Sequence, residues 1–282
     1  MVQIHSPLLS FFLPSIRFIR RFLFRPFVKK TSSERFWEID ALRGIAILLM
    51  IVYHFVFDLN YFGLYKADLD SPPVLLFLYP ISGTFLLLVG ISLTVSYSRA
   101  QQNLSNRKVQ VKFLKRGTSV FGLGLLITFV TWVYPHDGYI VFGALHCIGL
   151  SILFAYPLIR FRTFPLILGL LCIILGIFLR VTVMVDFPWL LWLGFVPSGF
   201  FTLDYFPLLP WFGVVLIGIF LGNRFYQNNT RKFSLKDHSQ SILSRGFCYL
   251  GRHSLIIYLL HQLLIVGLLY VIQLVINGSR IV

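Results

Sequence analysis

The first long apolar stretch of the chain opens with a carboxylate and a guanidinium and carries an imidazole deeper in. Asp40 and Arg43 stand at its start, and only apolar residues separate Gly44 from His54. On a helix of 100° and about 1.5 Å per residue, Arg43 and His54 lie within about 20° of one face and roughly 16 Å apart. Asp40 is close enough to pair with Arg43, although such a pair can also simply anchor a helix end. Because titratable groups are costly in hydrocarbon, this stripe indicates acid–base chemistry inside the protein.

The last apolar segment carries a second set of polar groups. Tyr258 and His261 lie one helical turn apart, so both can face one cavity, and Gln262 adds an amide beside them. The two polar spans would then face each other across a wet route through the bundle. For these side chains, as for His54, a hydrogen bond to a neighbouring helix is the structural alternative.

A carboxylate surrounded by aromatic residues precedes the sixth apolar segment. Asp204 and Tyr205 stand just before Pro207, Pro210 and Trp211. This arrangement suits a sugar, whose apolar face can stack on aromatic rings while its hydroxyl groups form hydrogen bonds. It equally suits an ordinary belt of aromatic residues at a membrane surface.

Composition places these residues in a membrane protein. Of the 282 residues, 57% are hydrophobic and only 12% are charged, which is too little polar surface to cover a soluble domain. A helix needs about 20 apolar residues to cross the hydrocarbon layer. We therefore predict an all-α, polytopic membrane helix bundle of about seven transmembrane helices. The expected spans lie near residues 42–60, 74–97, 117–134, 141–159, 163–183, 207–223 and 253–276.

The net charge of +15 is divided between alternate connections. Basic residues precede the first span and fill the second, fourth and sixth connections, whereas acidic residues predominate in the others. By the positive-inside rule, the N-terminus is cytoplasmic and the C-terminus external. This distribution argues against a nucleic-acid partner, for which the basic residues would gather in one groove.

The chain divides into two parts in this interpretation. Residues 1–34 mix arginines and prolines with large apolar residues, as in an amphipathic segment lying on an anionic inner leaflet. Residues 35–282 form one transmembrane domain, because no repeat or soluble insertion interrupts the spans. Cys147, Cys172 and Cys248 lack the spacing of metal ligands, and we expect neither a metal site nor a disulfide framework. The sequence also lacks the motifs of ATP binding, dinucleotide binding and serine hydrolysis.

Several motifs are similar to those of a known family. They are Asp40-Ala41-Leu42-Arg43-Gly44-Ile45-Ala46, then Gly83, Phe85 and Gly90, then Phe142-Gly143-Ala144-Leu145-His146, then Asp204-Tyr205-Phe206-Pro207-Leu208-Leu209-Pro210-Trp211-Phe212-Gly213, and last Leu250-Gly251-Arg252-His253-Ser254 with Tyr258 and His261. Through them the chain resembles the bacterial branch of the heparan-α-glucosaminide N-acetyltransferase catalytic-domain family, within the wider set of transmembrane acyltransferases. The resemblance covers about residues 35–275.

The resemblance implies a donor, an acceptor and a direction of transfer. Acetyl-CoA or another acyl-CoA would bind from the cytoplasm, and the acyl group would pass to an amine or hydroxyl of an external sugar or glycolipid. We expect the donor to be bound by Arg43, Asp40, Arg116 and His253, and the catalytic set to be His54, Asp58, Asp204 and His261. We expect membrane lipids as partners, in a bacterial plasma membrane.

One departure from the family changes the expected mechanism. Lysosomal relatives have an asparagine where His54 stands and a catalytic histidine on the following external loop, whereas residues 57–73 contain no histidine. We therefore expect His54 itself to act as general base, with Asp58 or Asp204 orienting it or the acceptor. The competing function is a transporter or flippase that uses the same polar stripe without forming a bond. A non-catalytic scaffold would leave that stripe unexplained.

Overall fold

The fold is that of a computed structural model, which describes residues 35–66, 68–69, 71–182, 185–226 and 230–278. Within these ranges the regular structure is helical and no named strand occurs. The elements are α2 (Trp37–Tyr61), α3 (Pro72–Asn103), α4 (Asn106–Val133), α5 (Ala144–Ala155), the short 3-10 helix η2 (Tyr156–Leu158), α6 (Phe164–Thr182), α7 (Leu208–Phe225), α8 (Ile242–Arg252) and α9 (Ser254–Gly278). The predicted all-α class is confirmed. The predicted N-terminal amphipathic segment, residues 1–34, lies outside the described residues.

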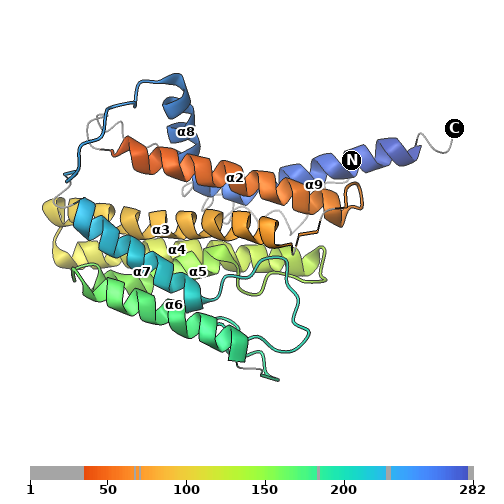
Figure 1. Cartoon of the computed structure of the whole chain (residues 1–282), viewed down its shortest axis with the longest axis horizontal. Coiled ribbons are helices and arrows are strands. Elements are labelled where there is room, and N and C mark those ends of the chain that lie inside the picture. Colours follow the sequence, from red (N-terminus) through yellow and green to blue (C-terminus); the bar gives the residue numbers. More distant parts are fainter. Residues whose placement is uncertain (1–34, 67, 70, 183–184, 227–229, 279–282) are drawn as a thin grey trace, which may run out of the picture.

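Six helices are long and apolar enough to cross a membrane, judged by length and composition: α2, α3, α4, α6, α7 and α9. They extend along the long axis of the molecule (Figure 1), and the chain is a polytopic helical membrane protein. The fourth predicted span is shorter than expected, since α5 and η2 together cover Ala144–Leu158. The second connection, expected near 98–116, is also shorter, because α3 continues to Asn103 and α4 begins at Asn106.

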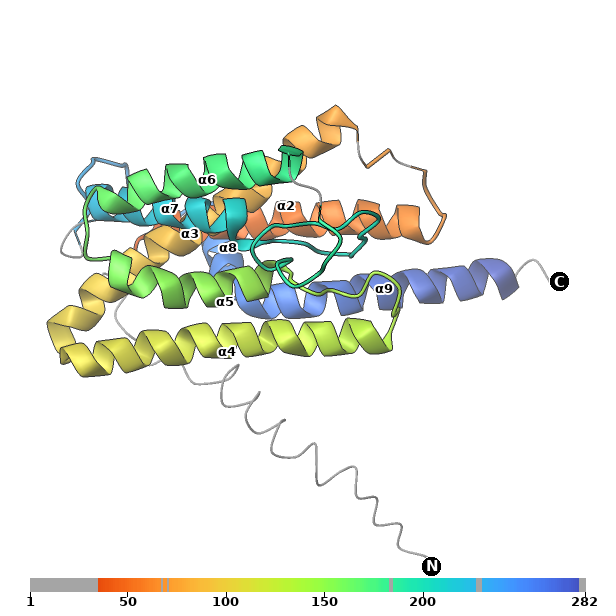
Figure 2. The ribbon, with the colours of Figure 1, turned by 90° about the horizontal axis from the view of Figure 1, so that it is seen from below.

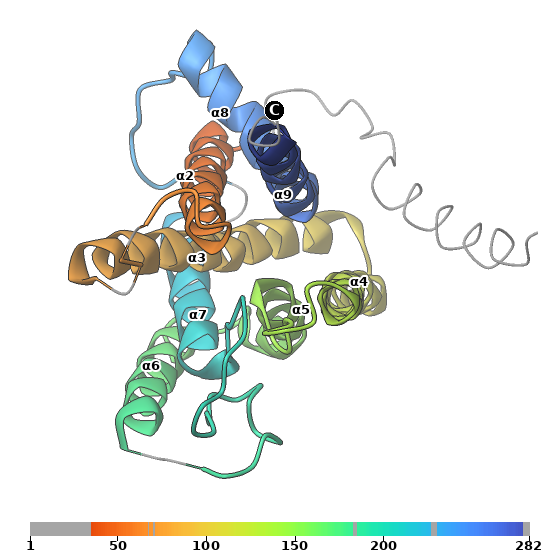
Figure 3. The same ribbon diagram turned by 90° about the vertical axis from the view of Figure 1, so that its right-hand side faces the viewer.

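Helix α3 is the central element of the bundle. It runs diagonally between two groups of helices, with α2, α8 and α9 on one side and α4 to α7 on the other (Figures 2 and 3). Its buried Leu86 and Leu93 join Phe113 of α4, Ile152 of α5 and Leu216 of α7 in the main apolar core. This core holds α3 in place, so a polar face of α3 can line a site on the side toward α2.

The ends of the helices define two ends of the molecule. At the end that we call the basic end, α2, α4, α6 and α9 begin and α3 and α7 finish; the opposite end is the outer end. At the basic end α8 lies across α2 (Figure 1). A Cβ on Gly44 would overlap the Phe247 carbonyl oxygen, and a Cβ on Gly251 would overlap the Asp40 carbonyl oxygen. Glycine is needed at both positions because the two backbones touch there.

Candidate active site

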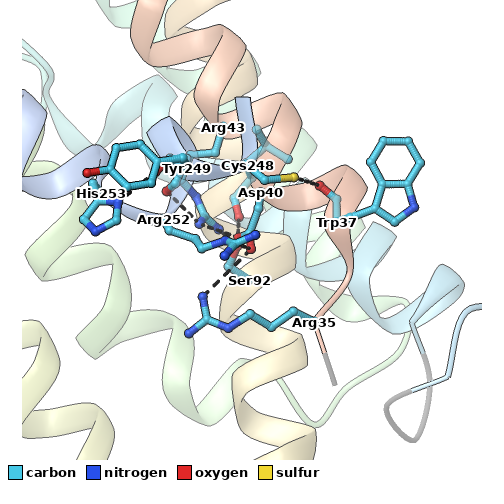
Figure 4. A network of polar contacts seen from close by, with 11 residues as sticks. Arg35, Trp37, Asp40, Arg43, Ser92, Cys248, Tyr249, Arg252 and His253 are labelled. Carbon is cyan, nitrogen blue, oxygen red and sulfur yellow. Dashed lines mark hydrogen bonds and ion pairs between the residues drawn. The ribbon is translucent and has the colours of Figure 1, made fainter. Parts of the chain in front are cut away.

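Asp40 is the centre of an arginine cluster at the basic end (Figure 4). Its carboxylate lies 3.3 Å from Arg43 Nη1, 3.6 Å from Arg252 Nε and 3.9 Å from Arg35 Nη1. Arg43 also donates a hydrogen bond to the Ser92 hydroxyl of α3, which fixes its guanidinium between α2 and α3. The predicted pairing of Asp40 with Arg43 is therefore present. Because Asp40 is only 8% exposed, three cations share one largely buried carboxylate.

This cluster lines an open cavity of about 810 Å³. Its basic lining residues are Arg35, Arg43, Arg99, Lys112, Arg116 and Arg252, and Asp40 is the acidic one. Six cations around one anion create a positive field that attracts polyanions. Guanidinium groups match the geometry of phosphate oxygens, and the volume falls in the usual range of small-molecule sites, about 300–1,000 Å³. The cavity can therefore hold a phosphorylated ligand. We call it the basic cavity.

Three of the four residues expected to bind the donor line the basic cavity: Asp40, Arg43 and Arg116. His253 stands apart from them, between α8 and α9. Its ring packs on Tyr249 with centroids 4.4 Å apart, and its Nδ1 donates to the Tyr249 carbonyl oxygen at 2.9 Å. His253 thus fixes the junction of α8 with α9, beside the cavity.

Sequence reasoning missed the α3 face of this cavity and, on α4, Lys112. The predicted spans leave Arg99 and Lys112 in the second connection, whereas both belong to helices that line the cavity. The signal was present in the sequence, because Ser92, Ser96, Arg99 and Asn103 recur every three or four residues along one face of α3. A hydropathy pattern ends a span at the first polar residues, so it concealed the continuation of the helix.

The second part of the site lies between the outer half of α2 and the first third of α9. His54 of α2 and His261 of α9 meet edge to face, with ring centroids 4.9 Å apart and ring planes at 88°. The two helices lie side by side (Figure 3). His261 is buried and His54 half-buried, and the contact directs the His54 ring toward α9.

Hydrogen bonds place the proton on the same nitrogen of both rings. Nδ1 of His54 lies 2.9 Å from the Met50 carbonyl oxygen, and Nδ1 of His261 lies 2.7 Å from the Tyr258 carbonyl oxygen. A carbonyl oxygen can only accept, so in the neutral rings each Nδ1 carries the hydrogen and each Nε2 keeps a lone pair. Within the described ranges, the buried Nε2 of His261 has no hydrogen-bond partner. Two basic nitrogens are therefore available to a hydrogen-bond donor.

Asp58 joins the same two helices one turn beyond His54. It is only 3% exposed, and the Gln262 amide of α9 donates to both of its oxygens, at 2.8 and 3.0 Å. Gln262 therefore forms the hydrogen bond to a neighbouring helix that was the alternative to a chemical role. Asp58 contacts α9 through this amide and stabilises the pairing of α2 with α9 at the level of the histidines.

Asp204 contacts α5 and α9 from the loop before α7. Its Oδ2 accepts from the Ala144 backbone N–H at 3.1 Å and from the Tyr258 hydroxyl at 3.4 Å. Gly143 permits this approach, because a Cβ there would overlap the same oxygen. Burial raises the pKa of Asp204 to about 6, although both hydrogen bonds act in the opposite direction. Since the Tyr258 carbonyl oxygen holds His261, Asp204 is linked to the histidine pair through one residue.

His146, which stands in the same motif as Gly143, has a structural role. Its Nδ1 accepts from the Gly143 N–H at 3.2 Å, and its Nε2 lies 3.2 Å from Thr128 Oγ1. The Thr128 hydroxyl donates to the Ile140 carbonyl oxygen at 2.7 Å, so it accepts from Nε2. Both ring nitrogens are satisfied, and the ring, 2% exposed, joins α4 to the start of α5.

The fold and the site together define a class: a polytopic membrane protein with a basic cavity at one end and a pair of contacting histidines between α2 and α9. Among the residues that the structure describes, no cluster of three or more histidine, cysteine or acidic residues could hold a metal ion. Cys147, Cys172 and Cys248 are free thiols.

The family follows from comparison with known proteins. A family model described as "Heparan-alpha-glucosaminide N-acetyltransferase, catalytic" matches residues 35–263. The chain belongs to this family, and membership implies a transmembrane acetyltransferase. Comparison with curated proteins and with solved structures finds no match.

Proposed function

We propose that this chain transfers an acetyl or other acyl group from cytoplasmic acyl-CoA to an amine or hydroxyl of a glycan-type acceptor on the external side of a bacterial plasma membrane. The observation that carries the proposal is the basic cavity of about 810 Å³ with its six cationic side chains. Acyl-CoA presents a nucleotide and several phosphates, which such a cavity would attract. The positive-inside bias assigns this end of the molecule to the cytoplasm.

In this proposal the basic cavity orients the donor. Arg43 and Arg116 bind phosphate oxygens, and Asp40 keeps the Arg43 guanidinium in place through the 3.3 Å ion pair. The bound acyl-CoA supplies a thioester carbonyl, and its linear arm must extend from the cavity toward His54. Eleven residues of α2 separate Arg43 from His54, a rise of roughly 16 Å.

His54 is the proposed general base. Its Nε2 lone pair removes the proton from the acceptor while the acceptor nitrogen or oxygen bonds to the acyl carbon. The carbon–sulfur bond breaks, and the proton passes to the thiolate that leaves. The ring of His261 lies 4.9 Å away between centroids. Its Nε2 lone pair can accept a hydrogen bond from the amine or hydroxyl of the glycan. Asp204 positions His261 through Tyr258, and Asp58 positions α9 through Gln262.

Radiolabelled acetyl-CoA separates this function from transport. Inside-out membrane vesicles expose the basic end to added acetyl-CoA and enclose the outer end. The proposal predicts covalent label on glycan or glycolipid inside vesicles with the chain, and none in vesicles with Arg43→Gln. Label that enters the lumen and stays in a small molecule would instead establish a transporter. Vesicles that give neither result would leave only a scaffold role.

The class of acceptor follows from a second measurement. Mass spectrometry of envelope glycans from cells with and without the protein should find an acyl group present only with the protein. An unchanged glycan profile together with labelled lipid would identify a glycolipid as the acceptor.

A further inference from the structure

A second cavity, of about 260 Å³, lies on the other side of α3 from the basic cavity. Its lining residues are Thr94, Tyr97, Ser98, Gln101, Ile159, Arg160, Arg162, Asn223 and Tyr226. On α3, Thr94 and Gln101 stand two residues beyond Ser92 and Arg99 of the basic cavity, a rotation of about 200°. The two cavities therefore use opposite faces of one helix and are separate sites.

The connection before α6 gives this second cavity two positive charges. Arg160 and Arg162 both line it, and Asn223 of α7 fixes the backbone between them. The Asn223 side chain donates to the carbonyl oxygens of Ile159 at 2.8 Å and Phe161 at 3.0 Å. Within the described part of the chain, no carboxylate forms an ion pair with either guanidinium. The cavity thus holds two cations on a turn that Asn223 braces, and no described carboxylate pairs with them.

The neighbouring acid on α2 is already paired. Glu38 accepts from the Tyr226 hydroxyl at 3.3 Å and from Arg231 Nη1 at 3.2 Å. The Glu38 carboxylate is therefore paired with Arg231 and hydrogen-bonded to Tyr226. Glu38 is thus not a partner of Arg160 or Arg162, and an external anion could bind the two guanidinium groups.

An exposed apolar stripe begins directly beside these arginines. Phe164, Ile167, Leu171 and Ile174 follow one another on one face of α6, and they are 47%, 64%, 58% and 65% exposed. Phe161, which is 42% exposed, extends the stripe to the turn with the two arginines. A ligand that meets both features has an anionic head and apolar tails. The stripe favours such a ligand over a free phosphate, for which it offers no contact.

We propose that the second cavity binds the phosphodiester of an anionic phospholipid in the leaflet at the basic end. Arg160 and Arg162 bind the phosphate oxygens, Ser98 and Gln101 offer polar contacts to the headgroup, and the acyl chains lie along α6. This site is independent of the acyl-CoA proposal, because it uses the opposite face of α3 and different side chains.

Native mass spectrometry of the delipidated full chain in detergent tests this site. Wild-type protein titrated with phosphatidylglycerol or phosphatidylcholine should bind the anionic lipid preferentially. The double variant Arg160→Gln/Arg162→Gln should lose this preference, with an affinity lower by about tenfold or more, since each basic residue near a lipid surface contributes about 1 kcal/mol. The matched control Lys236→Gln/Arg245→Gln removes two exposed charges of the basic end and should keep it. Should the double variant fail to fold, the two single variants are titrated in the same way.

Three results would overturn the proposal. The first is equal binding of the two lipids by wild-type protein. The second is unchanged phosphatidylglycerol binding in folded variants at Arg160 and Arg162. The third is displacement of the lipid by acetyl-CoA or inorganic phosphate, which would assign the cavity to a soluble anion. Continued binding of phosphatidylglycerol in the presence of both soluble anions supports a lipid site.

Discussion

Replacing His54 with alanine should stop acyl transfer while leaving donor binding unchanged. General-base catalysis contributes about 10²- to 10⁴-fold, so kcat should fall by that factor. The KM for acetyl-CoA should stay constant, because His54 lies roughly 16 Å along α2 from Arg43. The fold should survive, since the side chain is half-buried and its hydrogen bond to the Met50 carbonyl oxygen is worth about 1 kcal/mol. For a chain of this size that loss lowers the melting temperature by about 2–4 °C.

The assay is steady-state transfer of labelled acetyl groups by purified protein, with thermal unfolding measured on the same samples. His238→Ala is the control, because His238 is exposed and belongs to neither part of the site. His261→Ala should also lower kcat, and the double variant should lose less than the product of the two single effects, because the rings are in contact at 4.9 Å. Full activity of His54→Ala, or a rise in KM that accounts for the whole loss, would refute the assignment of His54 as base.

Three further variants probe the basic cavity, the crossing of α2 with α8, and the loop carboxylate. Arg116→Gln should raise the KM for acetyl-CoA by about tenfold or more with little change in kcat, because a hydrogen bond to a charged group is worth about 1.5–3 kcal/mol. Arg245→Gln, outside the cavity, should change neither constant, and equal effects of the two variants would contradict the site. Gly44→Ala should destabilise the protein by about 1–3 kcal/mol, because the new methyl group would overlap a carbonyl oxygen of α8. Gly122→Ala has open space at its new Cβ, so its melting temperature should be unchanged or higher. Asp204→Asn should change how stability depends on pH. The pKa of Asp204 is raised from 3.8 to about 6 in the fold, so its protonated form stabilises the protein below pH 3.8 and this contribution is lost as pH rises through about 6. Relative to the asparagine variant, the free energy of unfolding of the wild type should fall by on the order of 3 kcal/mol between pH 3.8 and about 6. The same pH dependence of this free energy in both proteins would contradict the burial of the carboxylate.

The sequence predicted the fold class and the spans because both depend on composition and local hydropathy. It placed the fourth span near 141–159, whereas the helix begins only at Ala144. The helix starts at Ala144 because of a tertiary contact, in which the Asp204 carboxylate accepts the Ala144 N–H at the first turn of α5. Hydropathy also could not reveal that α3 continues to Asn103, because a helix that leaves the membrane simply becomes polar. What failed were the boundaries that distant residues or the solvent determine.

The site was predictable only along single helices. The pairing of Asp40 with Arg43 and the shared face of Arg43 and His54 follow from helical periodicity, and both lay within reach of the sequence. The contact of His54 with His261 depends on the register between α2 and α9. That register is set by long-range packing and by the hydrogen bond between Asp58 and Gln262, which no local pattern encodes.

Among the described residues, the two buried histidines differ in how their ring nitrogens are used. His146 and His261 are both at most 8% exposed and both stand on apolar helices, so sequence alone treats them alike. His146 uses both ring nitrogens, toward Gly143 and Thr128. His261 uses one and keeps a buried lone pair that no described group satisfies. A buried nitrogen that accepts no hydrogen bond lowers the stability of the fold. Here it lies beside the ring of His54, whose Nε2 also keeps its lone pair. A substrate that donates a hydrogen bond between the two rings would remove this cost, which is why the histidine pair, and not His146, is where the acceptor should bind.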